Sequence, residues 1–467
     1  MISVQNHLRL LSGNRILLLF FSVLMLSSCG LFKSSTKTVS ERKTPVKKEK
    51  QEKKEKEVEP IEPIEWIIVD DEVVFDDGKL EDDVKDAIPS DLLKSHYEIS
   101  VLCPLYSSRS GLAQKNENVL RMVHFMQGME LASNRINIGE PTIKVNFIDI
   151  ESKPSRLQQL LKENYFDNID VIIGPYKTDD LALVVDYAKS ENKIVISPWN
   201  TNQSISNDYS NYIQWKPGLS THCEYQMQYI SDNYRYENII FISNNDTSED
   251  GDALEMYFET TPFKMNFRDE KPLVWPYFKE IEEERGSSQR FKSILSTSKT
   301  NVIVMPFWND LEKVNSFLTQ LRTARNKNHD IVILGFPQWI DNDGVDFTFF
   351  HDFNILISYN YHIDENNDDV LQFKREFLDN YHTTPTTEAY RASDILQFLS
   401  YQLSKKGLYF TQEPQQLFDN NVFSPINLFR VIDKDTAVSD RFDTFNHLEN
   451  KSIKMIRYDG ASFQFEY

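Results

Sequence analysis

The chain has 467 residues, 40% of them hydrophobic, which is too much polypeptide for one ordinary hydrophobic core. Its 71 acidic and 51 basic side chains give a net charge of −20, which argues against binding to nucleic acid. Three cysteines are too few for a disulfide framework, and Cys103 and Cys223 are expected to be buried free thiols. We therefore expect two lobes or two domains.

The first residues have the pattern of an export signal. Arg9 and Arg15 are followed by an apolar run, residues 16–26, that is too short to span a membrane comfortably. Next comes Leu-Ser-Ser-Cys-Gly at 26–30, which resembles a lipobox, the bacterial pattern in which a cysteine is acylated. We predict a lipoprotein signal peptide at 1–28; the alternative is an ordinary secretory signal, which still implies export.

Acylation of Cys29 would keep the mature protein on a membrane, since several acyl chains give stable anchoring. In bacteria with two membranes, an aspartate after the lipidated cysteine signals retention in the inner membrane. Gly30 occupies that place and favours the outer membrane. The predicted location is the cell envelope, lipid-anchored at the outer membrane and facing the periplasm.

Residues 29–95 are predicted to form the lipidated cysteine and a disordered tether. The segment 47–57 consists almost entirely of Lys and Glu and contains little that could be buried. A transient helix held by Glu/Lys pairs is the alternative. As a coil, the tether would reach on the order of 40–50 Å from the membrane.

From His96 onwards, apolar runs typical of buried strands alternate with amphipathic segments typical of helices. In the first half, strands are expected at 98–105, 142–150, 169–175 and 193–198, and helices at 119–136, 154–165 and 180–189. Strands this apolar, separated by helices, predict βαβ units and a parallel sheet covered on both faces.

The same pattern then starts again. Further strands are expected at 238–243, 301–306 and 330–335, with helices at 253–259, 289–298, 311–325, 370–381 and 388–404. Short strands are predicted at 454–458 and 462–467. Two such α/β halves in one chain direct the carboxyl ends of their strands toward a shared cleft.

Ordered landmarks along residues 96–467 carry a family resemblance. They include Pro104-Leu105, the helical segment 128–132 (Gly-Met-Glu-Leu-Ala), Asp149, Ile173-Gly174-Pro175, Ile196-Ser197-Pro198, Gly335, and the later series Phe377, Tyr381, Pro385, Ala389 and Asp394. Together they resemble the type I periplasmic binding proteins of the leucine/isoleucine/valine-binding kind, related to the receptor ligand-binding region.

The resemblance implies an α/β fold of two doubly wound parallel-sheet lobes joined by crossover segments. It places lobe 1 at about 96–217 and 365–420, lobe 2 at about 218–364, and C-terminal strands at 421–467. The crossings would fall near Pro217, at 262–276 and near Asp364.

Matching the family pattern residue by residue places the candidate ligand-binding residues on loops at strand ends. These are Tyr106, Ser107, Ser108, Tyr176, Lys177, Thr178, Trp199, Asn200 and Thr201 on lobe 1, and the loop 244–250 with Asp246, Phe307-Trp308 and Gln338-Trp339 on lobe 2.

The chemistry of these residues favours a polar ligand. Thr178 and Thr201 at helix starts suit a carboxylate, or else are plain helix caps. Asp246 and Asp341 could meet an amino group. Tyr106, Tyr176, Trp199, Trp308 and Trp339 could stack on a sugar or peptide, or close the pocket, or pack in the core. The aromatic residues make a branched-chain amino acid a poor expectation.

We expect no enzyme, no cofactor and no metal. The sequence lacks the common hydrolase, metalloprotease and nucleotide-binding motifs, and its nine histidines are scattered. Residues 246–252 partly imitate a calcium loop, but Tyr257 stands where the bidentate glutamate is needed.

Two functions remain open. The first is a solute-binding lipoprotein that captures a small amino-acid-like or peptide-like ligand by cleft closure, with an ABC permease as partner. The second is an outer-membrane scaffold or regulator that contacts peptidoglycan or a peptidoglycan synthase. The long tether and the aromatic cleft favour the second, and the polar cleft residues favour the first.

Overall fold

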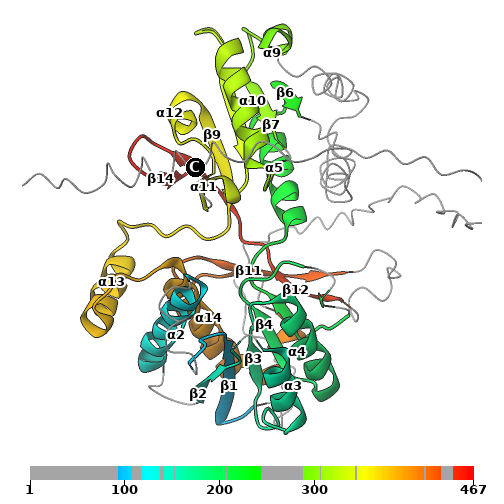
Figure 1. Cartoon of the computed structure of the whole chain (residues 1–467), viewed down its shortest axis with the longest axis vertical. Coiled ribbons are helices and arrows are strands. Elements are labelled where there is room, and N and C mark those ends of the chain that lie inside the picture. The colour runs from blue at the N-terminus through cyan, green and yellow to red at the C-terminus, as the bar shows by residue number, and fades with distance from the viewer. Residues whose placement is uncertain are drawn as a thin grey trace, which may run out of the picture. The chain divides into compact units, whose positions relative to one another are not determined.

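The computed structural model describes residues 93–107, 117–136, 141–151, 153–202, 205–206, 208–242, 288–305, 307–341, 344–414, 417–432 and 445–466. Their strands form an eight-stranded and a six-stranded sheet, which define lobe 1 and lobe 2 (Figure 1). The predicted signal peptide, Cys29 and nearly all of the predicted tether lie outside these residues.

The sheet of lobe 1 has the strand order β10-β11-β12-β5-β4-β3-β1-β2. Its parallel part pairs β1 with β2 and β3, then β3 with β4 and β4 with β5. The strands span β1 (His96–Cys103), β2 (Thr142–Asp149), β3 (Val171–Ile173), β4 (Ile194–Ser197), β5 (Tyr212–Gln214), β10 (Leu417–Phe418), β11 (Ile426–Val431) and β12 (His447–Asn450).

Helices cover both faces of this sheet because its strands are apolar on both faces. Helices α2 (Glu117–Ile136) and α14 (Thr387–Lys406) pack on one face, where Ile99 and Val101 of β1 contribute to the core. Helices α3 (Pro154–Lys162) and α4 (Thr178–Glu191) pack on the other face with Leu102. The fold class predicted from the sequence is therefore confirmed for lobe 1.

A glycine allows the two helices of the first face to approach closely. A Cβ atom added to Gly128 of α2 would lie 2.1 Å from the carbonyl oxygen of Ala389 in α14. No side chain fits in that space, so the landmark glycine and alanine of the sequence are a helix-packing contact. Helix α13 (Asp368–Tyr381) packs beside α2, and the short helix η4 (Gly407–Thr411) follows α14.

The sheet of lobe 2 has the order β14-β13-β9-β8-β7-β6. Its parallel part contains β6 (Asn238–Phe241), β7 (Asn301–Val304), β8 (Ile331–Gly335) and β9 (Asn354–Tyr359), and β13 (Lys454–Tyr458) and β14 (Phe463–Phe465) are antiparallel. Around it pack α5 (Leu219–Asn233), α9 (Ser288–Ile294), α10 (Leu311–Ala324), α11 (Gln338–Asp341) and α12 (Thr348–Asp352).

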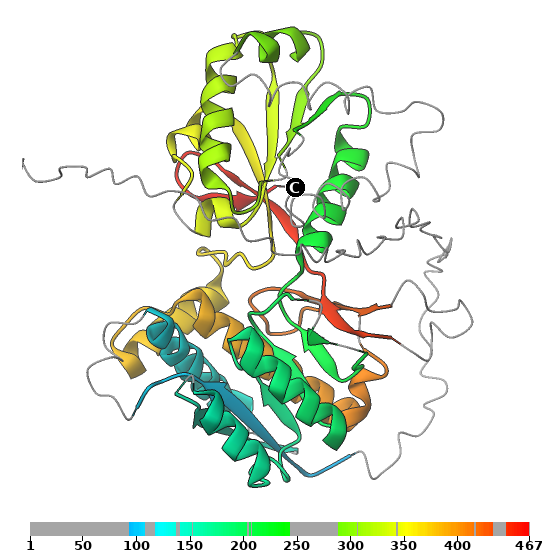
Figure 2. The same ribbon diagram turned by 45° about the vertical axis from the view of Figure 1, so that its right-hand side comes forward.

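Three described segments connect the lobes (Figure 2), namely β5 to α5, β9 to α13, and β12 to β13. The first two lie at the predicted crossings near Pro217 and Asp364. The third, at 451–453, divides the strands that were predicted as one C-terminal group at 421–467. Strands β11 and β12 belong to lobe 1, whereas β13 and β14 belong to lobe 2. The predicted crossing at 262–276 and the predicted helix at 253–259 lie outside the described residues.

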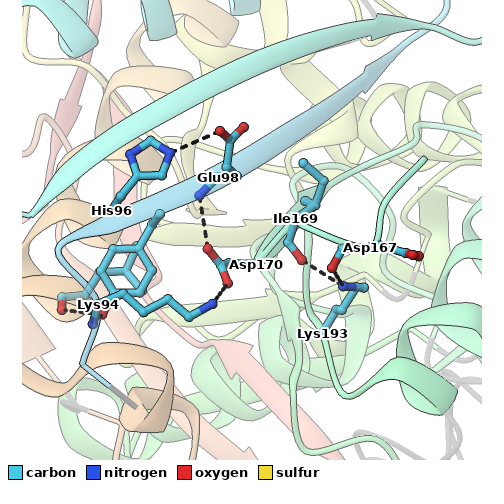
Figure 3. A network of polar contacts seen from close by, with 9 residues as sticks. Lys94, His96, Glu98, Asp167, Ile169, Asp170 and Lys193 are labelled. Atoms are coloured by element: carbon cyan, nitrogen blue, oxygen red, sulfur yellow. Dashed lines mark hydrogen bonds and ion pairs between the residues drawn. The ribbon is translucent and has the colours of Figure 1, made fainter. Parts of the chain in front are cut away.

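A polar network ties the beginning of β1 to the rest of lobe 1 (Figure 3). Asp170 accepts hydrogen bonds from Lys94 Nζ at 2.5 Å and from the Glu98 backbone N–H at 3.0 Å. His96 Nε2 lies 3.0 Å from Glu98 Oε1, and this contact helps to lower the pKa of Glu98 to about 2. These bonds fix the first described residues to the sheet.

Both cysteines of the described part are buried and free, which confirms the prediction made for Cys103 and Cys223. Within the described ranges no helix is long and apolar enough to cross a membrane. The same residues contain no group of His, Cys, Asp and Glu side chains that could hold a metal ion.

Candidate functional site: the interlobe cleft

A cavity of about 1010 Å³ is lined by residues of both lobes, and we call it the interlobe cleft. Lobe 1 contributes the loops after β3, β4 and β5, and lobe 2 contributes the start of α5 and the loops after β7 and β8. All of these are carboxyl ends of parallel strands or the connection between the lobes, where α/β folds hold ligands. The lining residues are Tyr176, Lys177, Thr178, Asp179, Trp199, Asn200, Thr201, Asn202, Lys216, Pro217, Leu219, Ser220, His222, Trp308, Pro337 and Gln338.

The N-terminus of α4 forms part of the lobe 1 wall. Lys177 is the N-cap residue and gives no side-chain cap, so the alternative that Thr178 is a plain N-cap is wrong. Thr178 is the first helical residue, and its hydroxyl accepts a hydrogen bond from Asn200 Nδ2 at 2.8 Å. The first backbone N–H groups of α4 therefore lack a side-chain cap beside the cleft, where the helix dipole favours an anion.

Trp199 lies in the same wall, and contacts within lobe 1 fix its position. Its indole Nε1 donates to Glu388 Oε2 at 2.8 Å, and its ring packs 4.9 Å from Phe125 and 6.0 Å from Tyr176 between ring centroids. Because its Nε1 is engaged with lobe 1, Trp199 presents its ring, not its donor, to the cleft.

Glu388 is buried and forms ion pairs with Arg391 at 2.7 Å and with Arg121 at 2.7 Å. Burial alone would raise the pKa of this carboxyl. The charge of Arg391, together with the hydrogen bonds from Arg121 and Trp199, outweighs burial and holds the pKa at about 2. The carboxylate is therefore ionised whenever the protein is folded at ordinary pH.

Lys216, near the beginning of the first crossing, is the second lysine of the cleft lining beside Lys177. Burial lowers its pKa, the charge of Arg391 adds to this effect, and Asp341 and Glu388 partly oppose it. An ammonium group deprived of water in this way would gain from an anionic ligand, because the ligand would replace lost solvation.

Gln338 and His222 represent the lobe 2 side of the cleft. The Gln338 side-chain oxygen is buried and accepts no hydrogen bond from any described residue, which leaves an acceptor beside the cleft. His222 is buried and contacts Ser358 Oγ at 3.0 Å. Burial, with the charge of Lys216, lowers the pKa of His222 to about 3, so the imidazole is neutral.

Five predicted residues do not line the cleft: Tyr106, Ser107, Phe307, Trp339 and Asp341. Phe307 is buried in the core of lobe 2. The backbone N–H groups of Tyr106 and Ser107 donate to Asp149 at 3.3 and 2.7 Å, and neither residue lines the cleft. Trp339 is 1% exposed, packs against Gly335 and donates its Nε1 to the Phe307 carbonyl at 2.8 Å, so its place is in the core of lobe 2. Asp341 accepts from the Tyr359 hydroxyl at 2.7 Å.

The structure thus brings eight of the predicted residues together along the cleft: Tyr176, Lys177, Thr178, Trp199, Asn200, Thr201, Trp308 and Gln338. Ser108, Asp246 and the lipidation residue Cys29 lie outside the described residues. Sequence reasoning missed Lys216, His222 and the buried pair Glu388–Arg391. The available signal for Lys216 was its position directly before Pro217-Gly218 at the predicted crossing. For Glu388 and Arg391 the sequence offered no signal, because a glutamate and an arginine three residues apart on a helix do not indicate that the pair is buried near a cleft.

Two doubly wound sheets that share a cleft and three connecting segments define a class of two-lobed binding proteins. Residues 124–406 match the family described as "Receptor family ligand binding region". Because this match spans more than half of the chain, the protein belongs to that family, which includes the type I periplasmic binding proteins. No curated protein matches the chain in sequence.

Solved structures share the fold at low identity. A protein from Rhodospirillum rubrum assigned to a branched-chain amino acid ABC transporter aligns with a TM-score of 0.55 at 11% identity. An ABC transporter substrate-binding protein from Desulfitobacterium hafniense and the C-domain of LpoA from Haemophilus influenzae, a regulator of PBP1A, each align with a TM-score of 0.50 at 12% identity. Each alignment covers 79% of this chain and 100% of the other.

Proposed function

We propose that this chain is an exported, non-catalytic binding protein that captures a small polar ligand with an anionic group in the interlobe cleft. The observation that supports this most is the N-terminus of α4, which lacks a side-chain cap and lies in a cavity of about 1010 Å³ beside Lys177 and Lys216. The two lysines outnumber the one carboxylate of the lining, Asp179. Amino acids and short peptides carry the carboxylate that such an arrangement favours.

The remaining lining fits the rest of such a ligand. Tyr176, Trp199 and Trp308 offer aromatic surface, and the Gln338 oxygen offers an acceptor for an N–H group. A branched-chain amino acid would leave much of this aromatic wall uncovered, so a peptide or a larger amino acid is the better fit. The lobes would close over the ligand by movement about the three crossings.

We further propose that Cys29 is lipidated and that the tether, residues 30–95, holds the binding domain on a membrane of the cell envelope. In this account the protein passes its ligand to an ABC permease, as the name of the Desulfitobacterium hafniense substrate-binding protein implies for that relative. Supporting this are the export signal and the Leu-Ser-Ser-Cys-Gly sequence.

The second candidate is an envelope regulator that contacts peptidoglycan or a peptidoglycan synthase. The observation in its favour is the predicted outer-membrane address, because Gly30 follows Cys29 and a permease resides in the inner membrane. The LpoA C-domain, which regulates PBP1A in Haemophilus influenzae, has the same fold.

Thermal unfolding of the full-length protein in detergent, with amino acids, di- and tripeptides and muropeptides, distinguishes the two candidates. A ligand present at about 100 times its dissociation constant stabilises the folded state by about 2.7 kcal/mol, which is a clear rise in Tm. A rise with an amino acid or peptide supports capture in the cleft. No rise with any compound, together with co-purification of a peptidoglycan synthase, contradicts it in favour of the regulator.

A further inference from the structure

A second cavity, of about 500 Å³, lies on lobe 1 and shares no lining residue with the interlobe cleft. We call it the α14 pocket, because it is built from the middle of α14, the C-terminal end of α2, the start of α13 and the segment between β10 and β11. We propose that the α14 pocket binds an uncharged saccharide.

The lining of the α14 pocket is dominated by side chains that carry an amide or a hydroxyl group. Each amide has an NH2 group that donates hydrogen bonds and a carbonyl oxygen that accepts them. Each hydroxyl donates one hydrogen bond and also accepts. Sugar hydroxyls also donate and accept, so the two surfaces complement one another. These side chains are Gln372, Gln397, Ser400, Tyr401, Ser404, Asn420 and Asn421.

The charges of the pocket favour a neutral ligand. Arg135 is the cation of the lining, but its guanidinium is bound to Glu376 and lies over the Phe373 ring at 5.6 Å. Asp369 is the acidic residue of the lining. An anion would thus meet a carboxylate without a free cation, and would lose solvation without compensation.

Several polar side chains of the pocket are unpaired within the described part of the chain. Those of Gln397, Ser400, Asn420 and Asn421 make no hydrogen bond to any other described residue, so the described part of the chain does not use their hydrogen-bonding capacity. Gln397 and Ser400 are half-buried on one face of α14, which fixes their backbone positions.

An aromatic surface completes the pocket. The ring of Tyr401 packs at 5.2 Å between centroids against the buried Phe418, and both line the cavity. A rigid ring between hydrogen-bonding groups suits the apolar face of a pyranose, whose edge carries the hydroxyls.

Saturation-transfer NMR on the full-length protein tests this with maltotriose and triacetylchitotriose as neutral probes and tri-galacturonate as the charged probe. We expect saturation transfer to at least one neutral trisaccharide and none to tri-galacturonate. Gln397→Ala/Asn420→Ala should weaken binding roughly tenfold or more, because two hydrogen bonds are lost, and Ser400→Trp, which fills the cavity, should abolish it.

Asn200→Ala in the interlobe cleft is the matched control and should leave saccharide affinity unchanged. Circular dichroism melting verifies that each variant folds. The proposal is overturned if neither neutral sugar binds, if binding survives Ser400→Trp in a folded protein, or if Asn200→Ala removes it. When a neutral sugar does bind, retention of the protein on insoluble chitin would identify a glycan polymer as the source of the sugar. Binding only to the soluble trisaccharides would identify a free oligosaccharide.

Discussion

The indole of Trp199 donates a 2.8 Å hydrogen bond to Glu388, and this bond joins the wall of the interlobe cleft to the buried ion pairs beneath it. Trp199→Phe keeps an aromatic ring, although a smaller one, and deletes the donor to a buried charge, which should destabilise the protein by about 1.5–3 kcal/mol. Urea unfolding without ligand measures the change.

Trp308→Phe is the matched control for that substitution. Trp308 lines the same cleft, is partly exposed, and its indole has no hydrogen-bond partner among the described residues, so its replacement should cost less than about 1 kcal/mol. Equal losses for the two variants would show that the bond to Glu388 contributes nothing specific.

The depressed pKa of Glu388, about 2 against an ordinary 4.5, predicts a specific dependence of stability on pH. A lowered folded-state pKa adds stability that is complete above pH 4.5 and is lost as the pH falls toward 2. Between neutral pH and about pH 3, wild type should lose about 2 kcal/mol more than Glu388→Gln, which cannot titrate there.

Urea unfolding of both proteins across this pH range provides the measurement, and Glu312→Gln, at an exposed position of α10, is the control. Parallel pH profiles for wild type and Glu388→Gln would mean that the carboxylate is not stabilised by its partners in the folded state.

Gly128→Ala should destabilise the protein even though alanine is the better helix former by about 1 kcal/mol. The added Cβ would lie 2.1 Å from the Ala389 carbonyl oxygen, so α2 and α14 would have to separate. We expect a loss of roughly 1–3 kcal/mol in chemical unfolding. Asn134→Ala, at an exposed position of α2, should leave stability unchanged within about 0.5 kcal/mol or raise it slightly. A stabilised Gly128→Ala variant would refute the close helix contact.

Glu449 holds the first crossing in place. Its Oε1 accepts from the Gly218 backbone N–H at 2.6 Å and from the Thr221 hydroxyl at 2.7 Å. Burial raises its pKa, and Lys451, Gly218 and Thr221 only partly oppose this. Glu449→Ala would leave both donors unpaired and should cost about 1–3 kcal/mol, whereas Glu449→Gln keeps an acceptor and should cost less.

Hydrogen exchange of the amides at 216–222 locates the effect of these two substitutions. Faster exchange confined to this crossing is expected for Glu449→Ala. The same loss of stability in both variants, with no change in exchange at 216–222, would contradict the role of Glu449 at the crossing.

The sequence predicted the fold well where local pattern determines structure. The apolar runs that became β1, β3, β4, β7 and β8 are continuous because both faces of each strand are buried, and this is visible without knowing any partner. The local pattern could not predict which sheet the last strands join. Whether β12 or β13 joins lobe 1 or lobe 2 depends on pairing with β5 and β9, far away in the chain.

The residues of the candidate site show the same difference between local pattern and long-range contacts. Lys177 and Thr178 were placed by a strand-to-helix pattern, which fixes the start of α4. Trp339 follows a strand in the same manner, but the direction of its ring depends on the space that Gly335 leaves in the core. Tyr106 and Ser107 were predicted at the cleft, whereas their backbone donors are taken by Asp149 from the neighbouring strand. Side-chain direction and long-range partners are the information that the residue pattern lacks.

Isothermal titration calorimetry of the full-length protein with the ligand found by thermal unfolding tests the role of the cleft directly. We predict one binding site, affinity lowered roughly 100-fold in Lys177→Ala/Lys216→Met because two charged contacts are lost, and unchanged affinity in the exposed-lysine control Lys292→Ala. Undiminished binding by a correctly folded Lys177→Ala/Lys216→Met protein would show that the ligand is held somewhere other than between the two lobes.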